Sequence, residues 1–384
     1  MQKADTENIS TQEIERICWS KTGDKPGPVL ILFVGIHGNE PAGLRAIERL
    51  SKKLSDKDTF KGAVYGVTGN IEALRLGVRF LDTDLNRLWE LFGTDKDFSL
   101  SNGKSAPSEY KESLEIKKTI ELITEKHQET ATEFVFADLH TTSSQSCAFV
   151  ILNDTLANRE LARKFPVPQV LGIEENIHGT LLSYINNLGH KAIGFEAGAH
   201  DDEASIKRSV AFLRLLLDRV GICKLLPEES AHWEKELDAH PGVPDTYYEV
   251  KYHKIVDDPT KFDMIKGFHN FDEIEEGESL AYENEELIEA PTYGRIFMPL
   301  YQKKGHDGFL IIREVPEFWL KLSGYLRKSF VHKYLKYLPG VTAVGSDSYE
   351  VDLRVARFLV KDIFHLFGYR VTEKNEHTLI CHRR

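Results

Sequence analysis

A histidine and a glutamate directly follow the first apolar run of the sequence. The run PVLILF (28–33) leads into GIHGNE (35–40), which holds His37 and Glu40 three residues apart. At this spacing one metal ion can reach both an imidazole nitrogen and a carboxylate. About one such pair is expected by chance, so the pair alone is equally consistent with a polar turn after a buried strand.

A second apolar run, FVFADLHTT (134–142), contains Asp138 and His140, which lie two residues apart and so on one face of a strand. The second ring nitrogen of a metal-binding histidine is usually held by a carboxylate or a carbonyl, and Asp138 is a candidate for this contact. Taken singly, His140 could also be a core histidine bonded to the backbone, and Asp138 could cap the next turn. Together, His37, Glu40 and His140 match the His₂Glu set of a catalytic zinc site, which keeps a fourth position open.

A third apolar run, KAIGF (191–195), ends in Glu196. Burying a carboxylate at a strand end is costly unless the group is paired or has a function. Zinc-dependent hydrolysis needs a base beside the water and later an acid for the leaving amine, and Glu196 suits both roles. His200, four residues further on, is expected to be a solvated residue at the start of the next helix.

The segment RFLDTDLNR (79–87) places Arg79 and Arg87 around Asp82, Asp84 and Asn86. Guanidinium groups bind carboxylates through two parallel hydrogen bonds, so an anionic group of a substrate is a natural partner. The alternative is a loop held by Arg–Asp pairs, and the spacing alone favours this simpler interpretation.

Apolar runs of strand length alternate with segments of helical periodicity over the first 221 residues. Expected strands include 28–33, 62–70 and 132–145, and expected helices include 41–54, 107–129 and 202–221. This alternation predicts an α/β fold with a mixed central sheet flanked by helices, in which ligands bind beyond the carboxyl ends of the strands. The connection 71–93 lacks a clean period and is expected to be only partly ordered.

Changes of composition divide the chain into three predicted parts. Residues 1–225 form a catalytic domain, 226–315 a smaller β-rich domain that shapes the substrate pocket, and 316–384 a mostly helical C-terminal extension. Within the extension, 349–369 is the strongest predicted helix. The aromatic content of the extension makes it a candidate dimer contact.

Composition restricts the partners and the compartment. The 384 residues are 41% hydrophobic and 28% charged, as in globular proteins, and the net charge of -11 argues against nucleic-acid binding. The N-terminal residues are polar and include no apolar core, so no signal peptide is expected. No apolar run of about 18 residues occurs, so no membrane association is expected and the expected location is the cytoplasm. The four cysteines are widely spaced and suggest neither disulfides nor a thiolate zinc site.

Four motifs in order, GIHGNE, DLNR, DLHTT and GFEAG, resemble the succinylglutamate desuccinylase/aspartoacylase family, which belongs to the zinc carboxypeptidase-like enzymes. The resemblance covers about residues 28–222 strongly and 240–315 loosely. It implies a zinc carboxypeptidase-like fold and one zinc ion per chain, held by His37, Glu40 and His140. It also implies that Glu196 is the general base and then the general acid.

The resemblance extends to residues that would contact the substrate. Arg79 matches the arginine that polarises the scissile carbonyl, and Asn86 with Arg87 matches the pair that binds the α-carboxylate. Asn70 matches another pocket residue, and Tyr301 corresponds to a pocket tyrosine, with a shift of one residue left open. The chain departs from aspartoacylases at Asn186, where an arginine would bind a second carboxylate.

The function implied is a zinc-dependent hydrolase that cleaves the amide bond of a small anionic N-acyl amino acid with metal-activated water. Such an enzyme is an amidohydrolase acting on linear amides. A metallocarboxypeptidase acting on short peptides is the alternative enzyme, because the same residues serve that chemistry. A catalytically inactive homologue that only binds the ligand is the alternative from another class.

Overall fold

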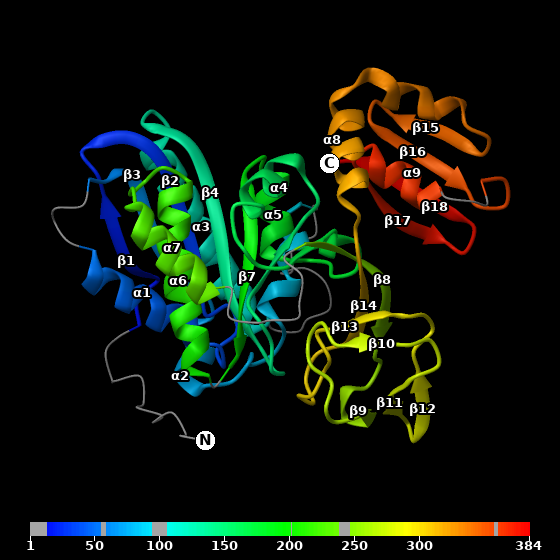
Figure 1. Ribbon diagram of the computed structural model, residues 1–384, viewed down its shortest axis with the longest axis horizontal. Coiled ribbons are helices and arrows are strands. Elements are labelled where there is room, and N and C mark those ends of the chain that lie inside the picture. The colour runs from blue at the N-terminus through cyan, green and yellow to red at the C-terminus, as the bar shows by residue number, and fades with distance from the viewer. Residues whose placement is uncertain (1–13, 55–58, 94–105, 201, 238–245, 357–359) are drawn as a thin grey trace.

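The computed structural model describes residues 14–54, 59–93, 106–200, 202–237, 246–356 and 360–384 (Figure 1). An eleven-stranded sheet is its main element. Along this sheet the strands follow the order β1 (Ile17–Thr22), β3 (Lys61–Thr68), β2 (Lys25–Val34), β4 (Ala131–Thr142), β7 (Lys191–Ala199), β5 (Phe149–Leu152), β6 (Gln169–Leu171), β8 (Tyr247–Ile255), β14 (Asp307–Glu314), β13 (Gly294–Phe297) and β10 (Glu273–Ile274).

The predicted α/β fold with a mixed central sheet is confirmed. Strand β2 pairs in parallel with β3 and β4, and β4 pairs in parallel with β7, whereas β1 and β5 are antiparallel to their neighbours β3 and β7. The helical elements of this part are α1 (Ala42–Lys53), α2 (Ile71–Leu76), η1 (Leu85–Arg87), η2 (Trp89–Gly93), α3 (Ser108–His127), α4 (Leu156–Ala162), η4 (Ile173–Glu175), α5 (Leu181–Asn187), α6 (Glu203–Arg219) and α7 (Pro227–Leu237).

Helices cover both faces of the sheet, which explains why β2 is apolar at successive positions. One face of β2 packs in a core with α1 and α6 through Leu30, Leu32 and Val34. The other face packs in a second core with α3 through Val29, Ile31 and Phe33. The connection 71–93 is more regular than expected, because α2, η1 and η2 occupy most of it.

The β-rich part continues the central sheet instead of standing apart from it. Strand β8 pairs in parallel with β6, and β14 and β13 extend the same sheet from β8. A separate antiparallel sheet contains β9 (Phe262–Met264), β11 (Ser279–Glu283) and β12 (Glu286–Glu289), and η5 (Pro259–Lys261) precedes it. The helix α7, which falls within the predicted 226–315 unit, packs instead against α6 of the catalytic part.

The expectation that 316–384 is mostly helical is wrong. This extension contains α8 (Glu317–Lys328), η6 (Phe330–Tyr337) and α9 (Val360–Leu366), but its core is an antiparallel sheet of β15 (Val341–Gly345), β16 (Ser348–Asp352), β18 (Thr378–Arg383) and β17 (Tyr369–Asn375). The predicted helix 349–369 begins inside β16, where Tyr349 and Val351 are buried and their neighbours are not. This period of two is the pattern of a strand with one buried face.

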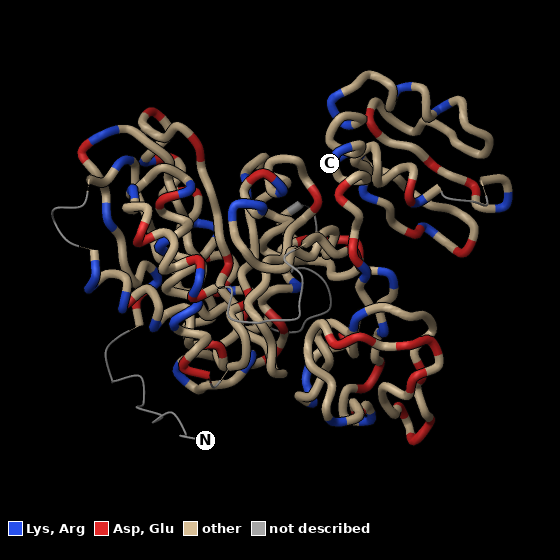
Figure 2. The backbone as a smooth tube through the Cα atoms, viewed as in Figure 1, with Lys and Arg blue, Asp and Glu red and all other residues tan. Residues whose placement is uncertain are grey.

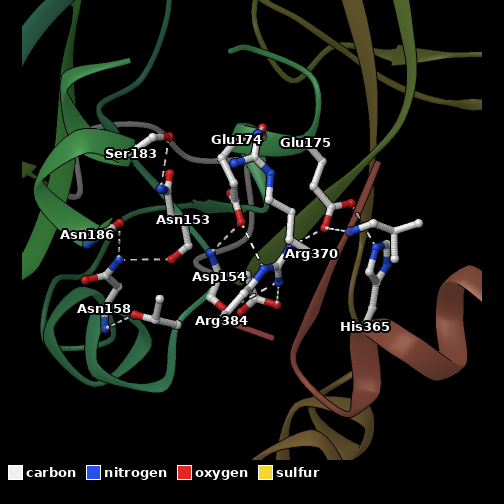
Figure 3. A network of polar contacts seen from close by, with 12 residues as sticks. Asn153, Asp154, Asn158, Glu174, Glu175, Ser183, Asn186, His365, Arg370 and Arg384 are labelled. Atoms are coloured by element: carbon white, nitrogen blue, oxygen red, sulfur yellow. Dashed lines mark hydrogen bonds and ion pairs between the residues drawn. The ribbon is translucent and has the colours of Figure 1, made fainter. Parts of the chain in front are cut away.

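A buried ionic cluster joins the extension to the catalytic part (Figure 3). The carboxylate of Asp154 contacts Arg159 at 2.5 Å, Arg327 at 2.5 Å and Arg384 at 2.6 Å. Arg384 also pairs with Glu175, at the end of η4. Because Arg327 and Arg384 come from the extension, the cluster fixes the extension against the loop after β5 and against η4.

Charged residues of both signs are interspersed over most of the backbone (Figure 2). No helix in the described part of the chain is both long enough and apolar enough to cross a membrane.

Candidate metal and active site

The strand ends that carry the predicted site residues lie side by side at one edge of the sheet. In the register of the sheet, Val34 of β2 is opposite Leu139 of β4, and His140 of β4 is opposite Glu196 of β7. His37 follows the end of β2 by three residues. The parallel pairing of β2, β4 and β7 therefore brings the three motifs together, as the sequence predicted.

Glu40 lies between the two histidines. His37 Nδ1 is 2.9 Å from Glu40 Oε1, and His140 Nδ1 is 3.0 Å from Glu40 Oε2. Each of the three residues, all buried, offers a ligand atom within 4.8 Å of the others. Two imidazole nitrogens and a carboxylate that converge in this way are a donor set suited to Zn²⁺. The residues present therefore fit the predicted ion.

Two further carboxylates hold the outer nitrogens of the histidines. His37 Nε2 is 3.1 Å from Asp84 Oδ1, and His140 Nε2 is 2.8 Å from Asp138 Oδ2. A carboxylate at Nε2 favours the tautomer that carries its proton there, which leaves the Nδ1 lone pair free to bind a metal. The contact expected from Asp138 is present. The contact of Asp84 with His37 was not predicted. The aspartate of the DLNR motif was the feature of the sequence from which this contact could have been inferred.

The charges of the site stabilise its carboxylates in the ionised state. Burial alone would raise the pKa of Glu40, but His37 and His140 hold it well below its usual value. Burial would likewise lower the pKa of His140, but Asp138 and Glu40 raise it well above the usual value. The pKa of Asp84 is also well below its usual value despite burial, because His37 is close. Ionised carboxylates are the form required beside a divalent cation.

Glu196 is buried next to this cluster and differs from the other acids. Its Oε2 has no hydrogen-bond partner among the described residues, and the side chain is 3% exposed. Burial raises the pKa of Glu196 to about 8, and the negative charges of Glu40 and Asp138 add to this effect. A buried carboxyl group with a raised pKa can accept a proton and return it near neutral pH.

Arg79 places a positive charge beside the same cluster. Its Nη2 is 3.0 Å from Asp84 Oδ2, and its Nη1 is 3.6 Å from Glu40 Oε1. Burial disfavours the charged guanidinium, but Asp84 and Glu40 outweigh burial and raise its pKa. The guanidinium therefore stays charged and positioned against the candidate metal ligands.

The glycine of GIHGNE is required by close packing. A side chain at Gly38 would place its Cβ 2.0 Å from the backbone carbon of Ala73 in α2. The Gly38 N–H donates to the carbonyl oxygen of Arg79 at 3.1 Å. The turn that presents His37 and Glu40 is thus packed directly on the segment that presents Arg79.

A cavity of about 490 Å³ opens from this cluster. It extends to Asn86 and Arg87 of η1 and to residues before and at the start of β14. Its apolar lining consists of Phe80, Ile151, Ile173, Ile177, Leu182, Met298, Pro299 and Leu300. Arg87 Nη2 is 2.6 Å from Asp307 Oδ2, so the catalytic part and the β-rich part meet at the cavity.

Two predicted substrate-binding residues do not line this cavity. Asn70 is fully buried, where its side-chain oxygen caps α2 at Ala73 and its amide donates to Glu109 Oε1 at 3.0 Å. The hydroxyl of Tyr301 donates to the carbonyl oxygens of Ile265 and Phe268 at 3.1 and 2.9 Å. These contacts direct both side chains into the protein, and the cavity is lined instead by the neighbours of Tyr301 in sequence.

His200 and Asn186 also differ from what the sequence suggested. His200 lines the cavity, and its Nδ1 is 2.8 Å from the hydroxyl oxygen of Thr141, so it is not simply a solvated residue. Asn186, where an arginine was missing, bonds to Asn158 and to the carbonyl oxygen of His190, away from the cavity.

Fold and site together define an α/β protein with a buried donor set suited to a metal ion at the carboxyl ends of its parallel strands. The chain belongs to the succinylglutamate desuccinylase/aspartoacylase family, because the model of the succinylglutamate desuccinylase/aspartoacylase catalytic domain matches residues 26–217. The predicted family resemblance is therefore confirmed. Named members of this family are deacylase hydrolases.

Individual relatives resemble this chain over a limited length. It is 45% identical to a succinylglutamate desuccinylase of Pseudomonas paraeruginosa over 64 residues, which are 16% of this chain and 19% of that protein. It is 40% identical to the enzyme of the same name from Pseudomonas putida over 67 residues, 17% of this chain and 20% of that protein. The chain thus aligns with about a fifth of the length of these curated relatives.

Solved structures resemble the chain over a greater length at lower identity. A succinylglutamate desuccinylase/aspartoacylase from Rhodobacter sphaeroides has a TM-score of 0.56 at 16% identity, covering 77% of this chain and 88% of that one. A succinylglutamate desuccinylase from Vibrio parahaemolyticus has a TM-score of 0.54 at 19% identity, covering 77% and 84%. At such identities the likeness concerns the fold.

Proposed function

We propose that this protein is a zinc-dependent deacylase that hydrolyses the amide bond of a small anionic N-acyl amino acid. The observation that carries the proposal is the buried convergence of His37, Glu40 and His140 with Glu196 beside them. Family membership supports the reaction class, since named members are deacylases. The cytoplasmic location and the homodimer predicted from the sequence stay predictions.

His37, Glu40 and His140 are the residues that would hold the zinc ion, through two Nδ1 atoms and one carboxylate. When bound, zinc supplies an acidic, activated water and a positive centre for a carbonyl oxygen. Asp84 and Asp138 keep the two imidazoles oriented toward the ion through their Nε2 atoms.

Glu196 and Arg79 would carry the proton transfer and the charge stabilisation. Glu196 accepts the proton of the attacking water at its carboxylate and returns it to the leaving amine nitrogen. Arg79 donates to the oxygen of the scissile carbonyl as negative charge develops there. One donor of this kind contributes about 3–4 kcal/mol to transition-state stabilisation in other enzymes.

Asn86 and Arg87 are the proposed site for the carboxylate of the substrate. Both line the cavity, and a guanidinium with an adjacent amide suits a planar carboxylate. The side chains of Asn70 and Tyr301 hold α2 and the β-rich part in place instead. The apolar lining around Ile173 and Ile177 leaves room for an uncharged portion of the substrate.

The test combines metal content with a substrate panel on the full chain. We expect about one zinc ion per chain in the wild type and its loss in His140→Ala. N-acyl amino acids should be hydrolysed faster than dipeptides, and Glu196→Gln should retain zinc without turnover. A protein that stays metal-free after zinc addition would disprove the proposal. Faster hydrolysis of dipeptides would instead indicate the metallocarboxypeptidase, and ligand binding without turnover would indicate the inactive homologue.

A further inference from the structure

Two neighbouring segments of the chain carry opposite charge. Residues 267–294 hold nine acidic residues and no Lys or Arg, whereas residues 318–346 hold five Lys or Arg and no acidic residue. The chain as a whole has 60 acidic and 49 basic residues, so uninterrupted stretches of one sign depart strongly from its average. Each segment therefore carries a surplus of one sign, although Lys321 pairs with Glu317, which directly precedes the basic segment.

The basic segment displays its charges among exposed aromatic rings. In α8, Phe318, Lys321, Tyr325 and Lys328 are exposed at helical spacings of three and four, and Ser323 on the opposite side is buried. In η6 the same mixture continues. We define the basic-aromatic face as Phe318, Lys321, Tyr325, Lys328, Phe330, Lys333, Tyr334, Lys336 and Tyr337.

These rings are unusually accessible for a folded protein. Phe318 is 65% exposed, Phe330 68% and Tyr337 72%. Large apolar side chains grouped on one surface and surrounded by charged residues are typical of a site of protein association. The buried Ser323 and Arg327 point the other way and attach α8 to the rest of the molecule, so the basic-aromatic face is turned outward.

The acidic segment forms a second surface, on the β11–β12 hairpin and the loop before it. We define the acidic face as Glu275, Glu276, Glu285, Glu286 and Glu289 together with Tyr282 and Leu287, all exposed. Neighbouring acids outside this face have partners, since Glu273 pairs with Arg295 and Glu283 with Lys254. None of the five glutamates of the face forms an ion pair with a described Lys or Arg.

The two faces cannot meet within one molecule. The extension that carries α8 lies at the upper right of Figure 1, and β11 and β12 lie at the lower right, with β8 and β14 between them. Figure 2 shows the acidic residues gathered over the part that contains β9, β11 and β12. Because these two parts are held apart, a contact between the complementary faces has to form between two copies of the chain.

We propose that the basic-aromatic face of one copy docks on the acidic face of a second copy. The two surfaces match in charge, and each offers exposed rings or aliphatic groups, such as Tyr282 and Leu287 opposite Phe318 and Phe330. Contact between two different faces is head-to-tail, so association gives a closed ring or an open chain of copies. A second copy is favoured as the partner because the chain itself carries the complementary acidic face, whose five glutamates are exposed and form no ion pair with a described Lys or Arg.

The experiment is sedimentation of the full chain at about 50 and 500 mM salt. We expect a mass above the 43.8 kDa of one chain at low salt and dissociation at high salt. One variant carries Lys321→Glu, Lys333→Glu and Lys336→Glu, and the other carries Glu276→Lys, Glu286→Lys and Glu289→Lys. Each variant alone should associate at least about tenfold more weakly.

Complementation separates specific docking from a general loss of charge balance. In an equimolar mixture, the altered face of the lysine variant is acidic and the altered face of the glutamate variant is basic. These two altered faces can pair, and the unaltered faces of the two variants can pair as well, so association should return. As a matched control, Lys111→Glu with Lys224→Glu changes two lysines of the catalytic part whose side chains are 84% and 82% exposed, and it should leave association unchanged.

A species of 43.8 kDa at both salt concentrations, up to about 100 μM, would overturn the proposal. So would association that neither variant weakens, or a mixture that stays monomeric. A monomer that binds phosphatidylserine vesicles or duplex DNA, and loses this binding in the lysine variant, would assign the basic-aromatic face to that partner instead.

Discussion

The two imidazoles of the site are oriented by carboxylates that would not touch the ion. Asp84 comes from the loop after α2, and it contacts His37 Nε2 at 3.1 Å while the Asn86 N–H donates to it at 2.9 Å. Its position therefore couples the loop that carries the substrate-binding candidates to His37, one of the proposed metal ligands. A change at Asp84 should affect the affinity for zinc although Asp84 is not a ligand.

We expect Asp84→Ala to weaken zinc binding by about 10–100-fold, because His37 loses the partner that fixes its tautomer and orientation. Competition with a chelator measures this affinity. The matched control is Asp82→Ala in the same loop, since Asp82 contacts Ser108 and not a histidine. Equal zinc affinity in wild type and Asp84→Ala would show that the contact has no role in orienting His37.

Asn70 is expected to act on stability and not on substrate binding. Replacing it with alanine removes the cap of α2, which should lower the free energy of unfolding by about 0.5–2 kcal/mol. The buried carboxylate of Glu109 also loses one of its donors. Thermal unfolding and KM should be measured together. A large rise in KM with unchanged stability would contradict this role and restore Asn70 to the substrate site.

The positions of single site residues could be predicted best from the sequence where the residue lies at, or just after, the end of a buried strand. His37, His140 and Glu196 could be placed together because parallel strands bring their carboxyl ends to one edge. Side chains in connections could not be placed in this way. Asn70 follows β3 as His37 follows β2, but whether its side chain turns inward as a helix cap depends on contacts with Glu109 that no local pattern encodes.

At the scale of elements, the extension shows why helical propensity alone led to the wrong prediction of a helix over 349–369. The residues of 349–369 include good helix formers, yet the alternation of buried and exposed positions in β16 is decided by pairing with β18. Such pairing involves residues some thirty positions away, and intrinsic propensity is routinely overridden by such tertiary contacts. The central strands could be told from helices in the sequence, because helices cover both faces of these strands and their apolar runs are therefore continuous.

The ionic cluster that docks the extension has a defined dependence on pH. Burial opposes ionisation of Asp154, but Arg327, Arg159 and Arg384 hold its pKa far below the usual value. A carboxyl with a lowered pKa in the folded state stabilises the fold fully above its unfolded pKa of about 3.9. This stabilisation is lost as the pH falls from there toward the lowered folded value.

We therefore expect Asp154→Asn to be less stable than the wild type at pH 7, by about 3–5 kcal/mol, because three guanidinium groups lose a buried partner. The difference should shrink as the pH is lowered below about 4, since Asp154 of the unfolded wild-type chain then takes up a proton while the folded carboxylate stays ionised, which removes the stabilisation. Denaturant unfolding at several pH values measures this difference in the free energy of unfolding. Asp263→Asn, which removes the exposed partner of Lys303, is the control. A difference that does not change with pH would refute the assignment to Asp154.

At the scale of the whole molecule, one continuous sheet links the candidate metal ligands to the β-rich part. The strands run from β2 and β4 through β6 and β8 to β14, so the start of β14 is held at the cavity by the same hydrogen-bonded frame that holds the strand ends. Asp307 at the start of β14 is consequently placed against Arg87, which lies 220 positions earlier in the chain. Both parts therefore line the cavity that we propose as the substrate site.

Asp307 competes for the guanidinium that we assign to the substrate carboxylate. It contacts Arg87 at 2.6 Å and His253 at 3.0 Å, and these partners lower its pKa to about 2 although burial acts in the opposite direction. A substrate carboxylate has to displace a fully ionised carboxylate from Arg87 at neutral pH. A neutral amide would compete less, because its oxygen carries no charge to attract the guanidinium of Arg87.

Asp307→Asn should therefore lower KM by about 3–10-fold with kcat nearly unchanged, since Arg87 is the proposed substrate-binding residue and does not contact Glu196, the proposed proton-transfer residue. A substrate whose carboxylate is replaced by an amide should show no such gain. Asp263→Asn, which breaks the exposed pair with Lys303 in the same β-rich part, should leave KM unaltered. If KM rises in Asp307→Asn, Asp307 holds Arg87 in its binding position, and the sheet contributes to substrate binding by orienting that guanidinium.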